Sequence, residues 1–283
     1  MAASNVQGTE PRVSELDPLG GHPAPETGGG AEDEDEEEQG ATMTLVEHLE
    51  ELRRRLFYSA VAVAVFSVLG FVFWNQILTF LTAPLPNVVD RIVPGGKASG
   101  TPKLIETHIG GPFLVSLKVA LATGIVIAMP VLLWQLWAFI SPALTRREKK
   151  YALPFTLLGV VLFAVGLALG YVVLRYPVNW LVNFGSNQFI LLPNADDYLT
   201  FVAYFLLIFG LVFELPLVLT FLGVLGVVNS RVLRAKRVYI LFGLWVAATF
   251  VTPGADPYSP IIVGAALTVL FELSIILLRI LKK

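Results

Sequence analysis

The sequence predicts an all-α polytopic membrane protein with six transmembrane helices. Of its 283 residues, 55% are hydrophobic and only 15% are charged, and the mean hydropathy is +0.71. A soluble core of this size would need a larger polar shell. Two further observations support this fold class: six apolar segments carry almost no charge, and basic residues gather at alternate ends of them.

The first part of the chain, residues 1–41, is predicted to be a disordered acidic tail. It is rich in Gly, Pro, Glu and Asp and cannot bury enough apolar surface to fold. Residues 32–38 alone carry seven negative charges, so the net charge of −2 hides a basic remainder. The tail lacks the apolar region of a signal peptide and is too acidic for a transit peptide.

Residues 42–55 are predicted to form a cytoplasmic amphipathic helix that leads into the first span. Thr44 followed by Glu47 is typical of a capping box. Four leucines at helical spacing form one apolar stripe: Leu45, Leu49, Leu52 and Leu56. The charged residues of this helix allow two interpretations. Glu51 can form a local i,i+4 pair with Arg55, and Glu50 with Arg54, while the arginines only anchor the span; or the charges serve a binding function.

The six apolar segments are residues 56–81, 113–140, 153–174, 198–228, 238–251 and 260–278. The second contains only Lys118, near its end, the fourth only Glu214 and the sixth only Glu272. The fifth has 14 residues, which span about 21 Å against a hydrocarbon core of roughly 30 Å. We expect the bilayer to thin there, or other subunits to cover the helix ends.

Basic residues decide the expected orientation. Fourteen lie on one side of the six spans and four on the other, so both termini, including the short tail 281–283, are expected in the cytoplasm. The fourteen are Arg53, Arg54, Arg55, Arg146, Arg147, Lys149, Lys150, Arg231, Arg234, Lys236, Arg237, Arg279, Lys282 and Lys283. The long loop 82–112 should then fold over the outer surface, and prolines 130, 154 and 216 should bend their spans.

Four motifs, in order along residues 43–280, resemble the TatC family, the receptor subunit of the twin-arginine protein translocase. They are His48-Leu-x-Glu51-Leu-Arg53, Trp137-Ala-Phe139-Ile-x-Pro-Ala-Leu144 followed by Glu148, Phe213-Glu214-x-Pro216, and Thr252-Pro253-x-x-Asp256. Residues 1–41 have no counterpart in this resemblance. It implies a concave six-helix bundle with both termini in the cytoplasm, in the bacterial inner membrane, with the thylakoid membrane as the alternative.

The resemblance also implies that Glu51 and Glu148 bind the paired arginines of cargo signal peptides. The number of spans places both acids on the cytoplasmic face, and two carboxylates can each accept a guanidinium in bidentate geometry. The same binding surface is expected to include His48, Arg53 and Phe139. For Glu148 a local salt bridge within its basic loop is the competing interpretation.

Glu214 and Glu272 are acids at membrane depth, where a carboxylate costs at least ~2.5–3.5 kcal/mol. By resemblance, Glu214 and Pro216 line a cavity where signal peptide or partner helices dock, and Glu272 is a further candidate contact. The alternative for both acids is a protonated side chain that hydrogen-bonds within the bundle. Pro112, Pro253 and Asp256 are expected to have structural roles in the outer loops.

Other function classes fit the sequence less well. A secondary transporter would explain intramembrane acids but is expected to show repeated, broken helices, and polar residues to line a channel are scarce. The histidines at 22, 48 and 108 lie outside the spans, no Asp lies within one, and there is no cysteine, so we predict a protein that is not an enzyme and needs no cofactor or metal.

Partners are expected by resemblance alone: twin-arginine signal peptides of folded cargo, single-span TatA/TatB-type subunits, membrane lipid and further copies of the chain, but no nucleic acid. The resemblance also implies transport driven by the proton-motive force.

Overall fold

The computed structural model describes residues 45–86, 104–140, 152–184, 188, 193–254 and 256–280, and these are almost entirely helical. The helices are α2 (Leu45–Val72), α3 (Trp74–Thr82), α5 (Gly111–Ile140), α7 (Ala152–Asn183), α8 (Ala195–Phe213), α9 (Leu215–Val224), α10 (Ser230–Ala235), α11 (Arg237–Val251) and α12 (Tyr258–Ile280). With α8 and α9 taken as one segment, five are long and apolar enough to cross a membrane, and α11 is a shorter apolar helix. The predicted all-α fold with six spans is confirmed.

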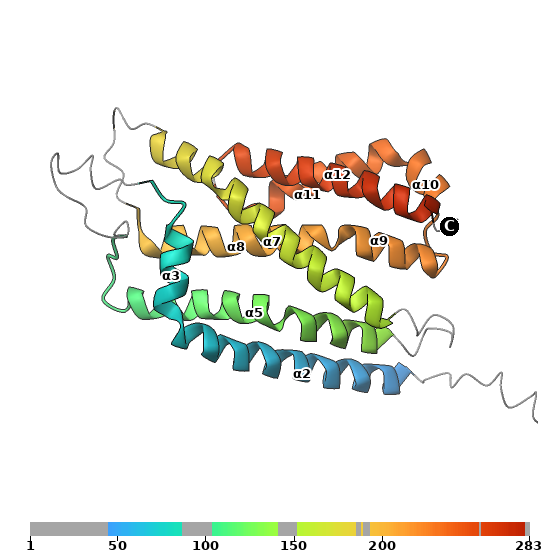
Figure 1. Ribbon diagram of the computed structural model, residues 1–283, viewed down its shortest axis with the longest axis horizontal. Coiled ribbons are helices and arrows are strands. Elements are labelled where there is room, and N and C mark those ends of the chain that lie inside the picture. The colour runs from blue at the N-terminus through green and yellow to red at the C-terminus, as the bar shows by residue number, and fades with distance from the viewer. Residues whose placement is uncertain are drawn as a thin grey trace, which may run out of the picture. The chain divides into compact units, whose positions relative to one another are not determined.

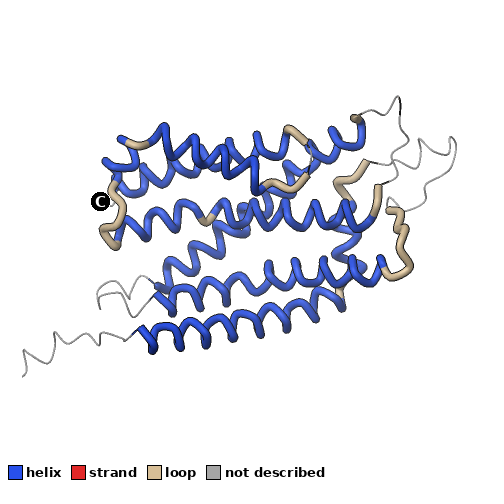
Figure 2. The backbone as a smooth tube through the Cα atoms, turned by 180° about the vertical axis from the view of Figure 1, so that it is seen from behind, coloured by secondary structure: helices blue, strands red, loops and turns tan. Residues whose placement is uncertain are grey.

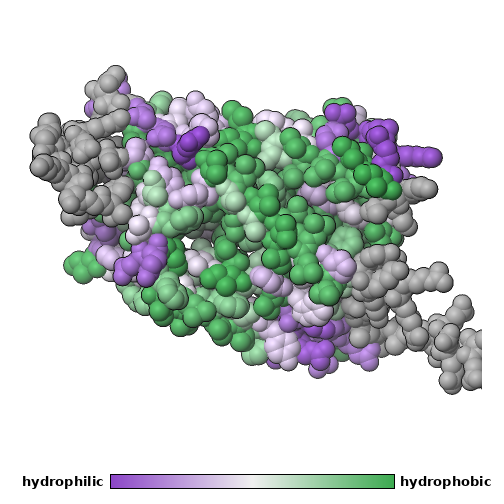
Figure 3. Space-filling model, viewed as in Figure 1, coloured by the Kyte–Doolittle hydropathy of each residue, from purple (hydrophilic) through white to green (hydrophobic). Residues whose placement is uncertain are grey.

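The long helices run side by side and alternate in direction (Figures 1 and 2). Helix α2 begins, and helix α12 ends, at the same end of the bundle, which we call the terminal end. We call the other end, where α3 lies across the bundle, the opposite end. Figure 3 shows apolar side chains over the middle and hydrophilic ones towards both ends, as expected for helices that span a membrane.

The first predicted span, 56–81, is not one straight helix, and this corrects the sequence prediction. Helix α2 runs without interruption from the charged segment to Val72, and the chain then turns at Phe73 into α3, which crosses the opposite end (Figure 1). Two tyrosine hydroxyls secure the end of α3: Tyr171 donates to the Phe80 carbonyl and Tyr198 to the Leu81 carbonyl, both at 2.9 Å. They add hydrogen bonds from α7 and α8 to carbonyls in the last turn of α3.

The fourth predicted span is also divided, because α8 ends at Phe213 and α9 begins at Leu215. Pro216 lies in the first turn of α9, where its missing N–H breaks no helical hydrogen bond. Pro154 likewise lies in the first turn of α7, so it does not interrupt that helix. Pro130 lies inside α5, which continues through it; a bend there remains a prediction.

Helix α2 packs mainly against α5, and small residues form the contact. A Cβ on Gly124 would collide with the Ser67 hydroxyl and lie 2.7 Å from the Ser67 backbone nitrogen. A Cβ on Gly70 would lie 3.0 Å from the Ala120 carbonyl oxygen. Membrane helices associate through such close backbone approach, since lipid supplies no hydrophobic driving force between them. The charged start of α2 is therefore positioned by α5.

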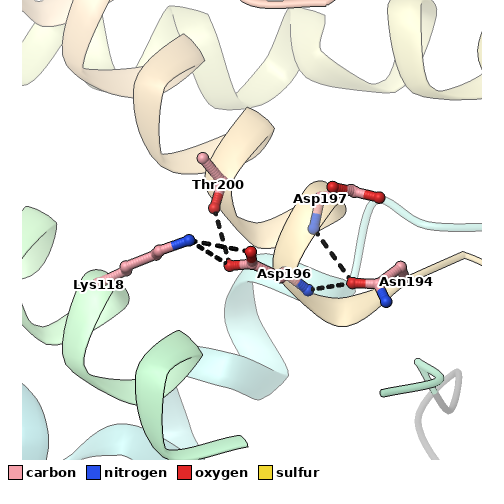
Figure 4. Close-up of polar contacts among 5 residues, drawn as sticks. All are labelled: Lys118, Asn194, Asp196, Asp197 and Thr200. Atoms are coloured by element: carbon pink, nitrogen blue, oxygen red, sulfur yellow. Dashed lines mark hydrogen bonds and ion pairs between the residues drawn. The ribbon is translucent and has the colours of Figure 1, made fainter. Parts of the chain in front are cut away.

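At the opposite end a polar cluster joins α5 to α8 (Figure 4). Lys118 Nζ lies 2.6 and 2.9 Å from the two carboxylate oxygens of Asp196. Asn194 accepts hydrogen bonds from the backbone nitrogens of Asp196 and Asp197 and so caps α8. Ile105 donates to the Pro193 carbonyl at 3.0 Å, which fastens the described end of the 82–112 loop to this cap. Residues 87–103 of that loop lie outside the described residues.

Candidate functional site

The first candidate site lies at the terminal end, where Glu51 of α2 forms an ion pair with Arg55. The Glu51 Oε1 atom lies 3.0 Å from the NH2 nitrogen of Arg55. The NH1 nitrogen of the same guanidinium donates to Gln135 Oε1 of α5 at 3.2 Å. One arginine therefore connects a carboxylate on its own helix to an amide on the neighbouring helix. The local i,i+4 pair that the sequence allowed is present.

Glu51 is less accessible than its position at a charged helix start suggested. The residue is only 7% exposed, and its second carboxylate oxygen, Oε2, is buried without a hydrogen-bond partner among the described residues. A buried carboxylate is costly unless it is paired, and Arg55 supplies the paired charge. Thr44, the expected cap of this helix, lies outside the described residues.

His48 and Phe139 pack on each other one turn before Glu51. Their rings stack with centroids 4.5 Å apart and planes inclined by 22°. This contact brings together two motifs that are far apart in the sequence, one on α2 and one near the end of α5. Arg53 is exposed on the same helix. Glu148, the second predicted acid, lies outside the described residues.

The second candidate site surrounds Glu214, at the junction between α8 and α9. Glu214 is 7% exposed, and neither of its carboxylate oxygens has a hydrogen-bond partner in the described part of the chain. Its Oε2 atom would lie 3.2 Å from a Cβ on Gly159, in a space bordered by Leu133 and Leu217. The carboxyl group thus lies among α5, α7 and α9, in apolar surroundings that leave it unsatisfied.

Glu272 differs from Glu214 because it has a partner within the chain. Its Oε1 atom lies 2.8 Å from Arg237 Nε, at the first residue of α11. The pair is partly exposed, and it joins the start of α11 to α12. For this acid the described chain supplies an ion pair, whereas the expected alternative was a hydrogen bond within the bundle.

The three residues with expected structural roles lie at helix starts and turns. Asp256 is buried, and its two oxygens accept hydrogen bonds at 2.7 Å from the backbone nitrogen and the hydroxyl of Ser259, in the first turn of α12. Pro112 is the second residue of α5, a position that proline favours. Pro253 follows the end of α11 and precedes Gly254, whose φ of +110° favours glycine.

Sequence reasoning missed Gln135, which holds the far side of the Arg55 guanidinium. A signal was available, because Gln135 is a polar residue inside an otherwise apolar span. Such residues in membrane helices commonly hydrogen-bond to a neighbouring helix. Which neighbour it contacts depends on the packing of α2 against α5, and spacing within one helix does not give that.

Comparison with known proteins identifies the family. The model of the family described as "Sec-independent protein translocase protein (TatC)" matches residues 47–265. A TatC protein of Desulforapulum autotrophicum is 38% identical over 238 residues, which are 84% of this chain and 84% of the relative. A TatC protein of Deinococcus radiodurans is 35% identical over 243 residues, covering 86% of this chain and 88% of the relative.

A solved structure agrees with these relatives. The crystal structure of a twin arginine translocase receptor, TatC, superposes with a TM-score of 0.68 at 31% identity, and the match covers 84% of this chain and all of that one. The four motifs that suggested the resemblance lie within residues 47–265, the range that the family model matches. The chain belongs to the TatC family, as a membrane-spanning, non-enzymatic subunit of the Sec-independent protein translocase.

Proposed function

We propose that the terminal end of this chain faces the cytoplasm and binds the paired arginines of signal peptides on folded cargo proteins. One observation carries the proposal: the Glu51 carboxylate already accepts a guanidinium, that of Arg55, at 3.0 Å. The space around this acid therefore accommodates the chemical group that a signal peptide would present. The stacked His48 and Phe139 lie one turn away and hold the starts of two motifs together.

Two carboxylates would allow two adjacent arginines to bind at once. A guanidinium offers a rigid fork of N–H donors that matches a carboxylate, whereas a lysine ammonium is a point charge. We assign Glu148 as the second acid because its motif follows the end of α5, the helix that packs on α2. Arg53, Phe139 and His48 complete the proposed surface, with Arg53 exposed at its edge.

Site-specific crosslinking tests this assignment. A photo-crosslinking residue is placed beside one of the two acids, at position 50 or 149, so that both carboxylates are kept, and the membrane-embedded protein is mixed with a signal peptide that carries Arg-Arg or Lys-Lys. We expect strong crosslinks to the Arg-Arg peptide at both positions and weak ones to the Lys-Lys peptide. The same residue at position 105, at the opposite end, is the control. Equal crosslinking at all three positions would contradict the proposal.

We also propose that Glu214 and α11 form the contact for single-span TatA/TatB-type subunits. The buried carboxyl group of Glu214 lacks a hydrogen-bond partner in the described chain, so a polar group on a partner helix would satisfy it. Helix α11 has 15 residues, and several of its large side chains are highly exposed, including Tyr239 at 81% and Phe250 at 85%. A neighbouring helix would cover them and relieve the length mismatch.

This chain has no cysteine, so cysteines can be introduced one at a time along α11 to map the contact. We expect positions 239, 242 and 250 to crosslink to a cysteine on the partner helix, and the buried position 248 to remain unreactive. Crosslinks to lipid-soluble reagents alone would contradict the contact. We further propose that several copies of the chain assemble in one receptor complex in the bacterial inner membrane. Transport by this complex would be driven by the proton-motive force.

A further inference from the structure

We infer that Arg55 is an internal competitor for the cargo arginine, so that a signal peptide binds Glu51 only by displacing it. The inference rests on the proposed function of Glu51. It concerns a residue that the binding motifs do not include: an arginine of the chain that occupies the acid before cargo arrives.

The contacts of Arg55 support this role. Its guanidinium holds Glu51 Oε1 at 3.0 Å with one nitrogen and Gln135 Oε1 at 3.2 Å with another. The Arg55 side chain keeps 25% exposure, while that of Glu51 keeps 7%. The charged group that covers the acid is therefore the more accessible one. A cargo side chain reaching Glu51 must first move Arg55.

The geometry also offers a path for the exchange. Glu51 Oε2 is buried, so an incoming guanidinium first meets the more exposed Arg55 and takes its place at Oε1. Arg55 can release Glu51 and keep its bond to Gln135. The net change replaces one arginine on the carboxylate by another, so the buried carboxylate is paired before and after the exchange.

Lysine is disfavoured in this exchange for a geometric reason. Its ammonium cannot match both carboxylate oxygens with a planar fork, so it displaces a bound guanidinium less well than arginine does. With Arg55 present, a peptide must outcompete an arginine, and the Arg-Arg peptide does this best. Because either peptide must break the same Glu51–Arg55 pair, Arg55 lowers both affinities by the same factor. Without Arg55 both peptides should therefore bind more tightly, and the ratio of their affinities should stay the same.

The competing account is that Arg55 only positions Glu51. The two accounts predict opposite results for Arg55→Gln, measured as the affinity of labelled Arg-Arg and Lys-Lys signal peptides for the purified full-length chain. Competition predicts that the Arg-Arg peptide binds Arg55→Gln on the order of fivefold tighter than wild type. The partly buried Glu51–Arg55 pair contributes more free energy than an exposed i,i+4 pair does, and in the variant the peptide no longer has to break it. Competition also predicts the same gain for the Lys-Lys peptide, because both peptides displace the same Arg55 contact. Positioning predicts weaker binding of both.

Arg54→Gln is the matched control, because it removes the same charge from an adjacent, exposed position of the same helix. General attraction or repulsion by the helix would change both variants alike, whereas competition changes only Arg55→Gln. Arg55→Lys keeps the charge but loses the fork, and it should fall between wild type and Arg55→Gln. If Arg55→Gln does not insert into the membrane, Gln135→Met is the second test. It removes only the hydrogen bond between Arg55 and Gln135, and it should tighten binding of the Arg-Arg peptide by a smaller factor.

Unchanged or weaker Arg-Arg binding by Arg55→Gln, or an equal gain by Arg54→Gln, would overturn the inference. Measuring Glu51→Gln distinguishes a failure of the competition by Arg55 from a failure of the proposed function. If Glu51→Gln weakens Arg-Arg binding while Arg55→Gln does not tighten it, Glu51 still binds the signal peptide and only the competition is wrong. If Glu51→Gln has no effect, the proposed function itself fails.

Discussion

Glu51 and Glu214 are equally buried, but only Glu51 has a charged partner within the described chain. Both are 7% exposed, yet Glu51 is paired with a guanidinium of its own helix and Glu214 has no partner in the described chain. Glu51 lies at the terminal end, on a helix with three consecutive arginines, and one of them supplies its charged partner. Glu214 lies among apolar side chains of α5, α7 and α9, where none is available.

The difference indicates two modes of recognition in one subunit. At Glu51 a ligand replaces an interaction that already exists, so its affinity is the difference between two ion pairs, and selectivity comes from the match between a guanidinium and the carboxylate. At Glu214 a ligand supplies an interaction that is missing, so affinity comes from relief of an unsatisfied buried group. Asp256 is a third case: it is 5% exposed, and the first turn of α12 satisfies both of its oxygens. It needs no ligand, and we expect it to have none.

The largest effect is expected at Glu214. Replacing it by Leu removes an unsatisfied carboxyl group from an apolar site and should raise the stability of the isolated chain by about 1–3 kcal/mol, while the bond to the partner subunit is lost. Glu214→Gln, which keeps hydrogen bonding, should retain more partner subunit than Glu214→Ala. Thermal unfolding and co-purification measure the two effects. Equal behaviour of Gln and Ala would show that hydrogen bonding at Glu214 is not the contact.

Gly124 tests whether the Glu51 site depends on the packing of α2 against α5. An added Cβ would collide with Ser67, so Gly124→Ala should cost about 1–3 kcal/mol and weaken signal-peptide binding, because Arg55 and Gln135 move apart. Binding of the partner subunit at Glu214 should persist. Gly110→Ala, just before α5, is the control, because a Cβ there meets no atom within 4 Å. Loss of both binding activities in Gly124→Ala would mean that the two sites are not independent.

Asp256 should behave as a structural residue only. Asp256→Ala removes the cap of α12 and should lower stability by about 0.5–2 kcal/mol, and Asp256→Asn should lower it less. Signal-peptide affinity should not change in either variant once the protein is inserted. An altered affinity in the stably inserted Asn variant would contradict the separation of Asp256 from the two binding sites.

The smallest effect is expected from the acidic segment. Deletion of residues 1–40 should leave insertion, signal-peptide affinity and transport of a model cargo nearly unchanged, because the deletion ends before the helix that carries Glu51. A quantitative transport assay in membrane vesicles measures this. A truncated protein that inserts but does not transport would show that the acidic run has a role in transport.

The sequence was sufficient for the helices and for the motifs, but not for their breaks and contacts. Hydropathy located all six apolar segments, including the fifth, which is too short to cover the full hydrocarbon core. It did not place the turn at Phe73, because residues on both sides of it are apolar; the polar Asn75 and Gln76 were the only local sign. The hydroxyls that hold α3 come from Tyr171 and Tyr198, about ninety or more residues further along the chain.

The same limit applies to the candidate sites. Spacing suggested the pair of Glu51 and Arg55, because i and i+4 lie on one helical face. It did not reveal that Glu51 is buried, which depends on how closely α2 approaches α5. Nor did it distinguish Glu272, paired with Arg237, from Glu214. Both are single acids in apolar segments, and only the three-dimensional packing brings a cation to one of them.

A double-mutant cycle between the protein and the peptide tests the central claim most directly. The affinities of Arg-Arg and Lys-Lys peptides are measured for wild type, Glu51→Gln and Glu214→Gln. A charge-assisted hydrogen bond is worth ~1.5–3 kcal/mol, so Glu51→Gln should weaken Arg-Arg binding about tenfold or more and Lys-Lys binding much less. Glu214→Gln should leave the ratio of the two affinities unchanged. Equal losses for both peptides in Glu51→Gln, or the same change of ratio in Glu214→Gln, would contradict recognition of the signal arginines by Glu51.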